Sequence, residues 1–89
     1  MHIVREAAPV RVELKLFATY RRYLPPHTAG NACHVTVPAG TPVVDLLAEL
    51  GVPSQRGVSV VLINGHDASP DRVVEDGDVV AVFPALAGG

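Results

Sequence analysis

The chain contains 89 residues, 48% of them hydrophobic and 18% charged, and its formal net charge at pH 7 is −2. The length is that of one domain. The apolar content and the small net charge argue against intrinsic disorder. Seven Lys and Arg residues against nine Asp and Glu residues provide no positive field for phosphates, so no nucleic-acid partner is expected.

Cys33 is the only cysteine, which excludes an intramolecular disulfide and any zinc site that needs two cysteines. We expect it to be a small buried hydrophobe rather than a nucleophile. The four histidines show no metal-ligand spacing, so no metal site is predicted. No stretch approaches the ~20 apolar residues that cross a bilayer, and residues 1–6 lack the apolar block of a signal peptide. We therefore expect a cytoplasmic protein with no membrane partner.

The first part of the chain predicts two strands joined by a turn. Residues 1–9 show no periodicity and are expected to form a flexible leader. Apolar and polar residues alternate over residues 10–17, the pattern of a strand with one buried face. Residues 33–37 again have strand composition. Between the two strands the sequence predicts a short, solvated helical turn followed by a loop; the turn contains Tyr20, Arg21, Arg22 and Tyr23.

A helix of about ten residues is predicted next. Thr41 is suited to the N-cap and Pro42 to the first helical position. Gly51 is placed to adopt the left-handed conformation that ends a helix. Apolar residues with helical spacing form one stripe that would cover a sheet: Val43, Leu46, Leu47 and Leu50.

The second half predicts an apolar strand over residues 58–63 and a tight hairpin turn at Asn64-Gly65. Residues 66–71 are polar and contain a proline, so only a short edge strand or none is expected. A last strand over residues 78–83 follows, and Pro84 is expected to leave the sheet because proline cannot donate a ladder hydrogen bond. One helix over one sheet gives an α+β fold, although periodicity leaves the strand order open.

The segment 84–89 is expected to be a mobile tail that ends in Gly88-Gly89. Fully extended, it would reach ~20 Å at roughly 3.3–3.6 Å per residue, which is enough to enter the active site of another protein. Two glycines place no side chain beside the terminal carboxylate, so this end would pass through a narrow channel. A carboxylate is a poor electrophile, but its mixed anhydride with AMP is readily attacked by sulfur or nitrogen.

Three parts of the sequence resemble the MoaD/ThiS family of ubiquitin-like sulfur carriers. They are Asn64-Gly65, the run from Val74 to Pro84, and the final Gly88-Gly89, with a weaker match over residues 16–22. The resemblance implies a β-grasp domain over residues 10–83, with a mixed sheet of four to five strands and the last strand beside the first. It also implies that a ubiquitin-activating-enzyme-like adenylyltransferase consumes ATP to adenylate Gly89, which then becomes a thiocarboxylate.

The resemblance implies a carrier that is not itself an enzyme and that binds no cofactor stably. The ending Phe83-Pro84 is typical of the molybdopterin synthase small subunit, whose sulfur-accepting partner is the large subunit. Other sulfur pathways remain alternatives, namely thiamine thiazole, tRNA thiolation, cysteine and thiosugar biosynthesis. So do a ubiquitin-like modifier joined through Gly89 to lysine and a β-grasp interaction module without C-terminal chemistry.

We expect the partner to dock on Phe83, Pro84 and Leu86, since aromatic residues often anchor interfaces. Phe83 must face away from Val80 and Val82, which share the other side of the strand; a core position for Phe83 is the alternative. The carboxylates are not expected to form a catalytic pair. Asp45 and Glu49 are four residues apart on a solvated helix, and Asp76 and Asp78 flank a turn glycine.

Overall fold

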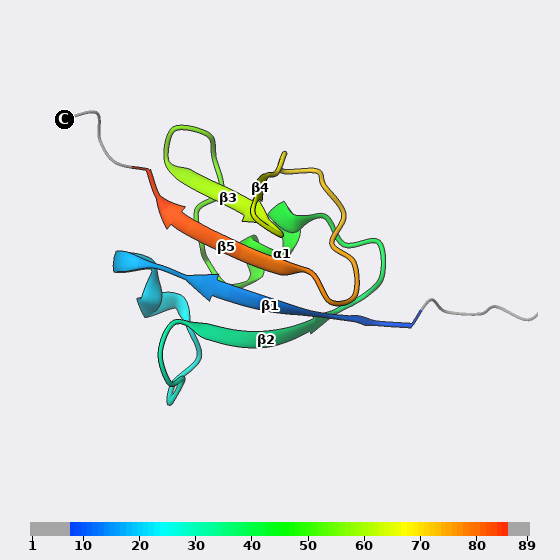
Figure 1. The fold of residues 1–89 in the computed structure, drawn as a ribbon, viewed down its shortest axis with the longest axis horizontal. Helices are drawn as coiled ribbons and strands as arrows, with labels where there is room; N and C mark the ends of the chain where they lie inside the picture. The colour runs from blue at the N-terminus through cyan, green and yellow to red at the C-terminus, as the bar shows by residue number, and fades with distance from the viewer. Residues whose placement is uncertain (1–7, 86–89) are drawn as a thin grey trace, which may run out of the picture.

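The computed structural model describes residues 8–85, which form a five-stranded sheet with one helix packed on one face (Figure 1). The strands are ordered β2-β1-β5-β3-β4, and β1 runs parallel to β5 while all other neighbours are antiparallel. The expected α+β fold, with the last strand beside the first, is therefore confirmed. The elements in chain order are β1 (Val10–Leu16), the 3₁₀ helix η1 (Ala18–Tyr23), β2 (Ala32–Val37), α1 (Val43–Glu49), β3 (Ser59–Ile63), β4 (His66–Asp67) and β5 (Val79–Pro84).

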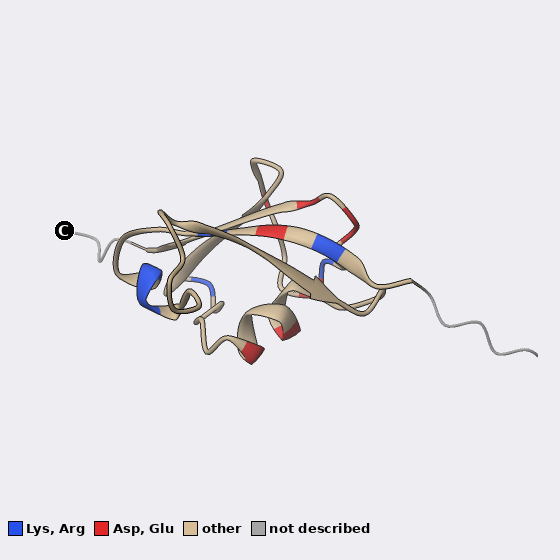
Figure 2. Ribbon diagram, turned by 90° about the horizontal axis from the view of Figure 1, so that it is seen from below, with Lys and Arg blue, Asp and Glu red and all other residues tan. Residues whose placement is uncertain are grey.

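The core lies between α1 and the face of the sheet that α1 covers (Figure 2). Because side chains alternate along a strand, every second residue of β1, β3 and β5 points into this layer. Leu14 of β1, Val82 of β5 and Leu47 of α1 are completely buried there. Cys33 is half-buried and packs against the same core, and burial raises the pKa of its thiol. Cys33 thus packs as the expected small hydrophobe, but it is half-buried and not fully buried.

The start of α1 differs from the prediction. The Thr41 hydroxyl donates a hydrogen bond to the Pro38 carbonyl oxygen at 2.6 Å, and Pro42, in an extended conformation, is the N-cap residue. The predicted N-cap role of Thr41 is wrong because backbone groups satisfy the first helical amides instead. Val43 N–H donates to the Arg72 carbonyl oxygen at 2.8 Å, so the loop before β5 closes the helix start. The helix has seven residues, fewer than the ten expected.

The end of α1 is as predicted. Gly51 has a φ of +77°, and Val52 N–H donates to the Leu47 carbonyl oxygen at 2.9 Å. The acceptor and the donor are the first and last of six consecutive residues. This is the hydrogen bond that defines a Schellman C-cap. The buried Val52 then joins the core, so the chain reverses tightly toward β3.

Candidate functional site

The predicted site residues divide into two groups. Leu86, Gly88 and Gly89 lie outside the described residues, whereas Phe83 and Pro84 lie at the end of β5. The structure therefore defines the surface from which the last residues depart, and the site is built from that surface.

Pro84 remains in the sheet, so the prediction that the chain leaves the sheet there is wrong. Pro84 pairs with Ser59 of β3, and Ala85 N–H donates to the Val58 carbonyl oxygen at 2.8 Å. Amides of successive strand residues point to opposite sides. Since the Ala85 amide points to β3, the Pro84 nitrogen points toward the β1 side, where β1 has already ended at Leu16. No ladder hydrogen bond is lost, so proline is tolerated at this position.

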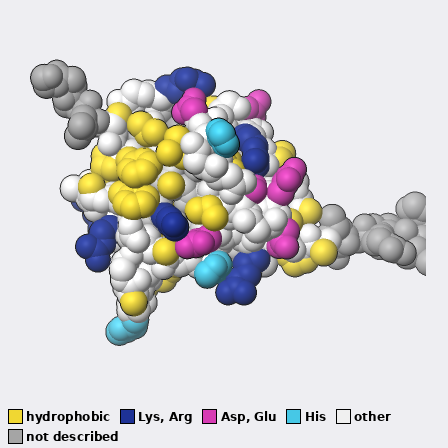
Figure 3. All heavy atoms as spheres, viewed as in Figure 1, with side chains coloured by type: hydrophobic (Ala, Val, Ile, Leu, Met, Phe, Trp, Pro, Cys, Tyr) yellow, Lys and Arg dark blue, Asp and Glu magenta, His cyan; other side chains and the backbone are white. Residues whose placement is uncertain are grey.

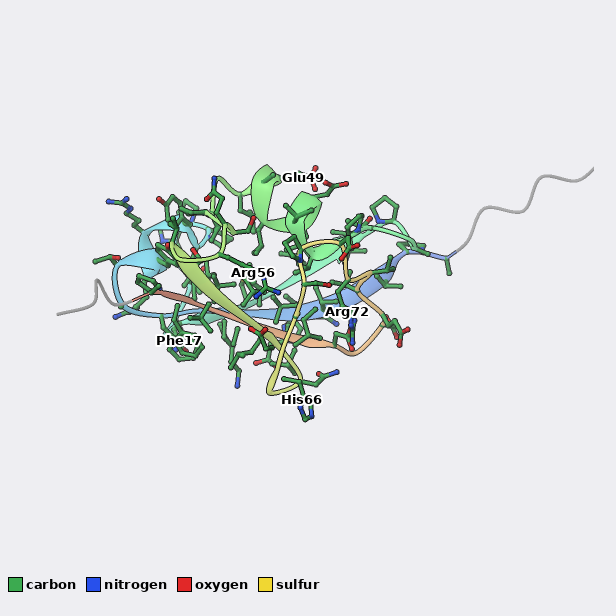
Figure 4. The ribbon with its side chains drawn as sticks, turned by 90° about the horizontal axis from the view of Figure 1, so that it is seen from above. Phe17, Glu49, Arg56, His66 and Arg72 are labelled. Atoms are coloured by element: carbon green, nitrogen blue, oxygen red, sulfur yellow. The ribbon has the colours of Figure 1, made fainter. Side chains whose placement is uncertain are left out.

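Phe83 stacks on Phe17 at the end of the sheet. Their ring centroids are 4.5 Å apart with planes inclined by 13°, and both side chains are half-buried. The two rings meet because Leu16 pairs with Val82 in the parallel β1–β5 ladder, which sets the next residue of each strand side by side. In Figure 4, Phe17 lies on the side of the sheet opposite α1 and Glu49. The pair thus belongs to the open face and not to the core.

Apolar side chains of β3 and β5 extend this stack into a surface, here called the apolar patch. Val60 pairs with Phe83 and is 39% exposed. Figure 3 shows hydrophobic side chains gathered on this part of the open face, near the end of β5. The patch consists of Phe17, Val60, Leu62, Ala81 and Phe83. Its Phe17 was missed from the sequence, where it appeared only as one position in an alternating strand.

The only lysine of the chain, Lys15, borders the apolar patch. It lies opposite Ala81 in the β1–β5 ladder and opposite Ala32 in the β1–β2 ladder. Its two neighbours across the strands are thus both alanines. Among residues 8–85 no carboxylate lies within salt-bridge distance of it. Lys15 therefore places a cation beside an apolar surface.

Asp78 does more than form a turn, which corrects the sequence interpretation. Asp78 is 5% exposed, and its carboxylate accepts hydrogen bonds from Arg72 at 2.8 Å and Asn64 at 2.9 Å. It also accepts from the Glu75 amide at 2.8 Å. Burial alone raises the pKa of Asp78, but these hydrogen bonds and the Arg72 charge outweigh it and leave the pKa below its usual value. Asn64 Oδ1 in turn accepts from Val79 N–H at 2.9 Å, so the β3–β4 turn is fixed on the start of β5.

Tyr20 is buried, so the expectation of a wholly solvated turn is wrong for this residue. Its hydroxyl is 2.7 Å from that of Ser59, which donates to the Pro53 carbonyl oxygen at 2.7 Å. Because Ser59 pairs with Pro84, this buried network supports the strand that holds the end of β5. By contrast Arg21 and Arg22 are exposed, as the sequence predicted.

The described residues contain no evident catalytic centre. A small, partly open pocket of about 30 Å³ lies beside Val43, Val61 and Ala68, with room for roughly one water molecule. Over residues 8–85 no three His, Cys, Asp or Glu side chains are grouped as metal ligands. In the same range, no helix has the length and hydrophobicity of a membrane span. The apolar patch and the strand end are thus the prominent surface features.

Comparison with known protein families gives a match to the ThiS family over residues 14–89. Among solved structures, the chain is similar to a Pyrococcus furiosus protein assigned as subunit 1 of a molybdopterin converting factor. The identity is 28% and the TM-score 0.67, over 86% of this chain and 99% of the other. The chain is also similar to small archaeal modifier protein 1 from Haloferax volcanii, with 26% identity and a TM-score of 0.68, over 86% of this chain and 99% of the other.

A ubiquitin from Caldiarchaeum subterraneum has the same fold, with 13% identity and a TM-score of 0.55 over 92% of this chain and 100% of the other. These structural similarities confirm the ubiquitin-like β-grasp fold. A comparison with curated protein sequences gave no significant match.

Proposed function

The chain belongs to the ThiS family of small ubiquitin-like proteins, and we propose that it carries sulfur on the carboxyl group of Gly89. Family membership makes it a carrier or a modifier of the small archaeal modifier type. Of these two functions we favour the sulfur carrier, with the chemistry on the last residue of the sequence.

An adenylyl transfer followed by an acyl transfer converts the carboxylate into a sulfur donor. A Gly89 carboxylate oxygen attacks the α-phosphorus of ATP, pyrophosphate leaves, and an acyl adenylate forms. Sulfide (HS⁻) then attacks the acyl carbon, the bond between that carbon and the AMP oxygen breaks, and AMP leaves. Loss of the remaining proton leaves a thiocarboxylate on Gly89. A ubiquitin-activating-enzyme-like adenylyltransferase supplies the active site, and the carrier supplies the acyl group.

The observation that carries the proposal is the position of the apolar patch beside the end of β5. A partner that covers Phe17 and Phe83 lies next to Ala85, from which residues 86–89 continue. Partly exposed aromatic residues in such a surface are typical anchors of protein interfaces. Pro84 and Ala85 are held against the β3 segment by strand pairing and a backbone hydrogen bond. When the domain is docked on a partner, the position from which residues 86–89 continue is therefore fixed. We assign Phe83, Pro84 and Leu86 to partner docking on this basis.

The acceptor we favour is a molybdopterin synthase large subunit, with this chain as the small subunit. The similarity to the Pyrococcus furiosus protein supports this choice, as does the Phe83-Pro84 ending. Delivery to thiamine thiazole, tRNA, cysteine or thiosugar biosynthesis would use the same thiocarboxylate and a different acceptor.

A protein modifier is the second candidate, supported by the similarity to the Haloferax volcanii modifier. Here a lysine amine replaces sulfur as the nucleophile, and Gly89 forms an isopeptide bond as AMP leaves. High-molecular-weight conjugates in cells, lost when Gly88 and Gly89 are deleted, would identify this function.

The activation step can be tested with purified protein, ATP and the cognate adenylyltransferase. We expect ATP–pyrophosphate exchange that depends on this chain and disappears when Gly89 is deleted. A variant with Ala7 deleted, which leaves the C-terminal end intact, is the control and should behave as wild type. Exchange that persists without Gly89 would overturn the assignment.

A further inference from the structure

The strand β2 forms one edge of the sheet (Figure 1). In an edge strand, half of the backbone N–H and C=O groups face away from the neighbouring strand. Glu13 and Arg11 of β1 direct their backbone groups toward the β5 side: Glu13 N–H donates to the Asp78 carbonyl oxygen and Arg11 N–H to the Asp76 carboxylate. Their partners across the ladder, His34 and Thr36, therefore point their N–H and C=O groups away from β1. Within residues 8–85 these outward groups have no hydrogen-bond partner.

The edge formed by β2 lacks the usual protection against pairing. Natural sheets blunt their edges with very short strands, with charged side chains or proline, or with bulges. The opposite edge, β4, has two residues, whereas β2 has six. The β2 sequence Ala-Cys-His-Val-Thr-Val contains no Lys, Arg, Asp, Glu or Pro, and its six residues pair with β1 in an unbroken register. Such an edge can accept a further strand.

An apolar groove of about 260 Å³ runs between this edge and α1. Val35 of β2 and Leu50 of α1 are half-buried in its wall, and the exposed Glu49 lies at its rim. A strand added to β2 would lie about 4.8 Å from it. Residues opposite His34 and Thr36 would share their hydrogen bonds and face the open side of the sheet. The residue opposite Val35 would face the groove, so apolar side chains are favoured at alternate positions.

The charge at the rim of the groove defines the partner further. Glu49 and Asp45 are both exposed on α1, and Figure 2 shows acidic residues on this helix. The single ion pair among residues 8–85 joins Arg72 to Asp78 and involves neither Asp45 nor Glu49. Two carboxylates one helical turn apart repel each other, and a cation bound there would relieve the repulsion.

We propose that the β2 edge and its groove bind an extended segment of another protein, apolar at alternate positions and flanked by Lys or Arg. The segment pairs antiparallel with β2 through His34 and Thr36, places its apolar side chains over Val35 and Leu50, and sets a cation at Glu49. In the sheet, β1 and β5 separate this surface from β3, beside whose start Ala85 is held, and the surface is independent of the proposed sulfur chemistry.

The test is an NMR titration of the ¹⁵N-labelled full chain with the peptide acetyl-Lys-Val-Thr-Val-Thr-Val-Lys-amide. Amide shifts are expected at residues 32–37 and 46–50, and the amides of His34 and Thr36 should gain protection from hydrogen exchange. The peptide with both Lys replaced by Glu is the matched control and should bind at least about fivefold more weakly, as for the loss of one interaction worth about 1 kcal/mol. Equal binding of both peptides, or no shifts in these segments, would overturn the proposal.

The variant Thr36→Pro isolates the edge, since it removes an outward N–H and no β1–β2 hydrogen bond. It should stay folded and bind the lysine peptide at least about fivefold more weakly. Because the β5 end is unchanged, ATP–pyrophosphate exchange should be unaffected. Glu49→Lys should reverse the preference between the two peptides. Unchanged affinity in Thr36→Pro would contradict strand addition. Broadening of the β2 amides with protein concentration alone would instead assign this edge to a second copy of the chain.

Discussion

The two sides of β5 have different roles although they alternate residue by residue. Val80 and Val82 face α1 and are completely buried, whereas Ala81 and Phe83 on the other side remain partly exposed. One helix covers one side only, so the second side is left with apolar residues that the fold itself does not enclose. The difference teaches that apolar content alone does not identify the core, because β5 contributes both to stability and to a surface for a partner.

Leu14→Ala should give the largest effect on stability, because it disrupts the packing on the face of the sheet that α1 covers. Leu14 is completely buried, and truncating such a leucine costs about 3 kcal/mol through lost burial and the cavity left behind. Urea denaturation would measure the loss. The matched control is Leu62→Ala on the half-exposed side of β3, for which a loss below about 1 kcal/mol is expected. Equal losses would contradict the division between the two sides.

Phe83→Ala, on the uncovered side of β5, should affect partner binding more than it affects stability. We expect its affinity for the adenylyltransferase to fall roughly 30-fold, which corresponds to about 2 kcal/mol, because the stack on Phe17 is lost from the apolar patch. Val73→Ala, an exposed apolar residue outside the patch, serves as the control and should leave the affinity unchanged. Isothermal titration calorimetry would measure both. If Phe83→Ala lowered stability and left the affinity intact, the core interpretation of Phe83 would be correct.

The hydrogen bonds and the ion pair of Asp78 should make the stability of the folded protein depend on pH. The pKa of Asp78 is lowered in the folded protein, so its stabilising effect is present above the unfolded pKa of about 3.9. That effect is lost as the pH falls through the folded pKa. Asp78→Asn should cost about 1.5 kcal/mol at pH 7, because the amide places donors against the N–H groups of Glu75 and Arg72.

Denaturation curves at pH 7 and pH 3 would test the role of Asp78. The difference between wild type and Asp78→Asn should be smaller at pH 3, because this pH lies below the unfolded pKa and part of the stabilising effect of the ionised carboxylate is lost there. A difference of the same size at both pH values would show that charge on Asp78 does not contribute. The affinity for the adenylyltransferase at pH 7 should stay within about twofold of wild type, since Asp78 is buried away from the apolar patch.

Pro84→Ala should give the smallest effect on stability. The Pro84 nitrogen points to a side where β1 has ended, so no hydrogen bond is gained or lost in the ladder. We expect a loss below about 1 kcal/mol, from the greater entropy of the unfolded chain, measured by thermal denaturation. Pro84→Gly should cost more, because glycine adds further backbone freedom. A large loss for Pro84→Ala would show that the ring itself holds the strand end.

Local signals in the sequence predicted the elements well. Alternation located β1, the Asn64-Gly65 pair located the hairpin, and Gly51 ended α1 where expected. The features that were missed depend on long-range contacts. Phe17 meets Phe83 only through the parallel pairing of β1 with β5, and periodicity does not specify which strands are neighbours.

The same reason explains the other errors. Tyr20 looked like part of a polar turn because its partner, Ser59, lies 39 residues away. Thr41 had the residue type of an N-cap, but the backbone of the distant Arg72 reached the first helical amide instead. Local sequence patterns depend on residue type, but the contacts that decided these two cases are made with residues far away in the sequence.

Intact mass spectrometry tests the central claim most directly. The full chain is incubated with ATP, the cognate adenylyltransferase and a sulfide source, and its mass is compared with that of the chain lacking Gly89. We predict that one oxygen of the full chain is replaced by sulfur and that the shortened chain stays unchanged. A thiocarboxylate on the shortened chain, or none on the full chain after adenylation, would contradict the account.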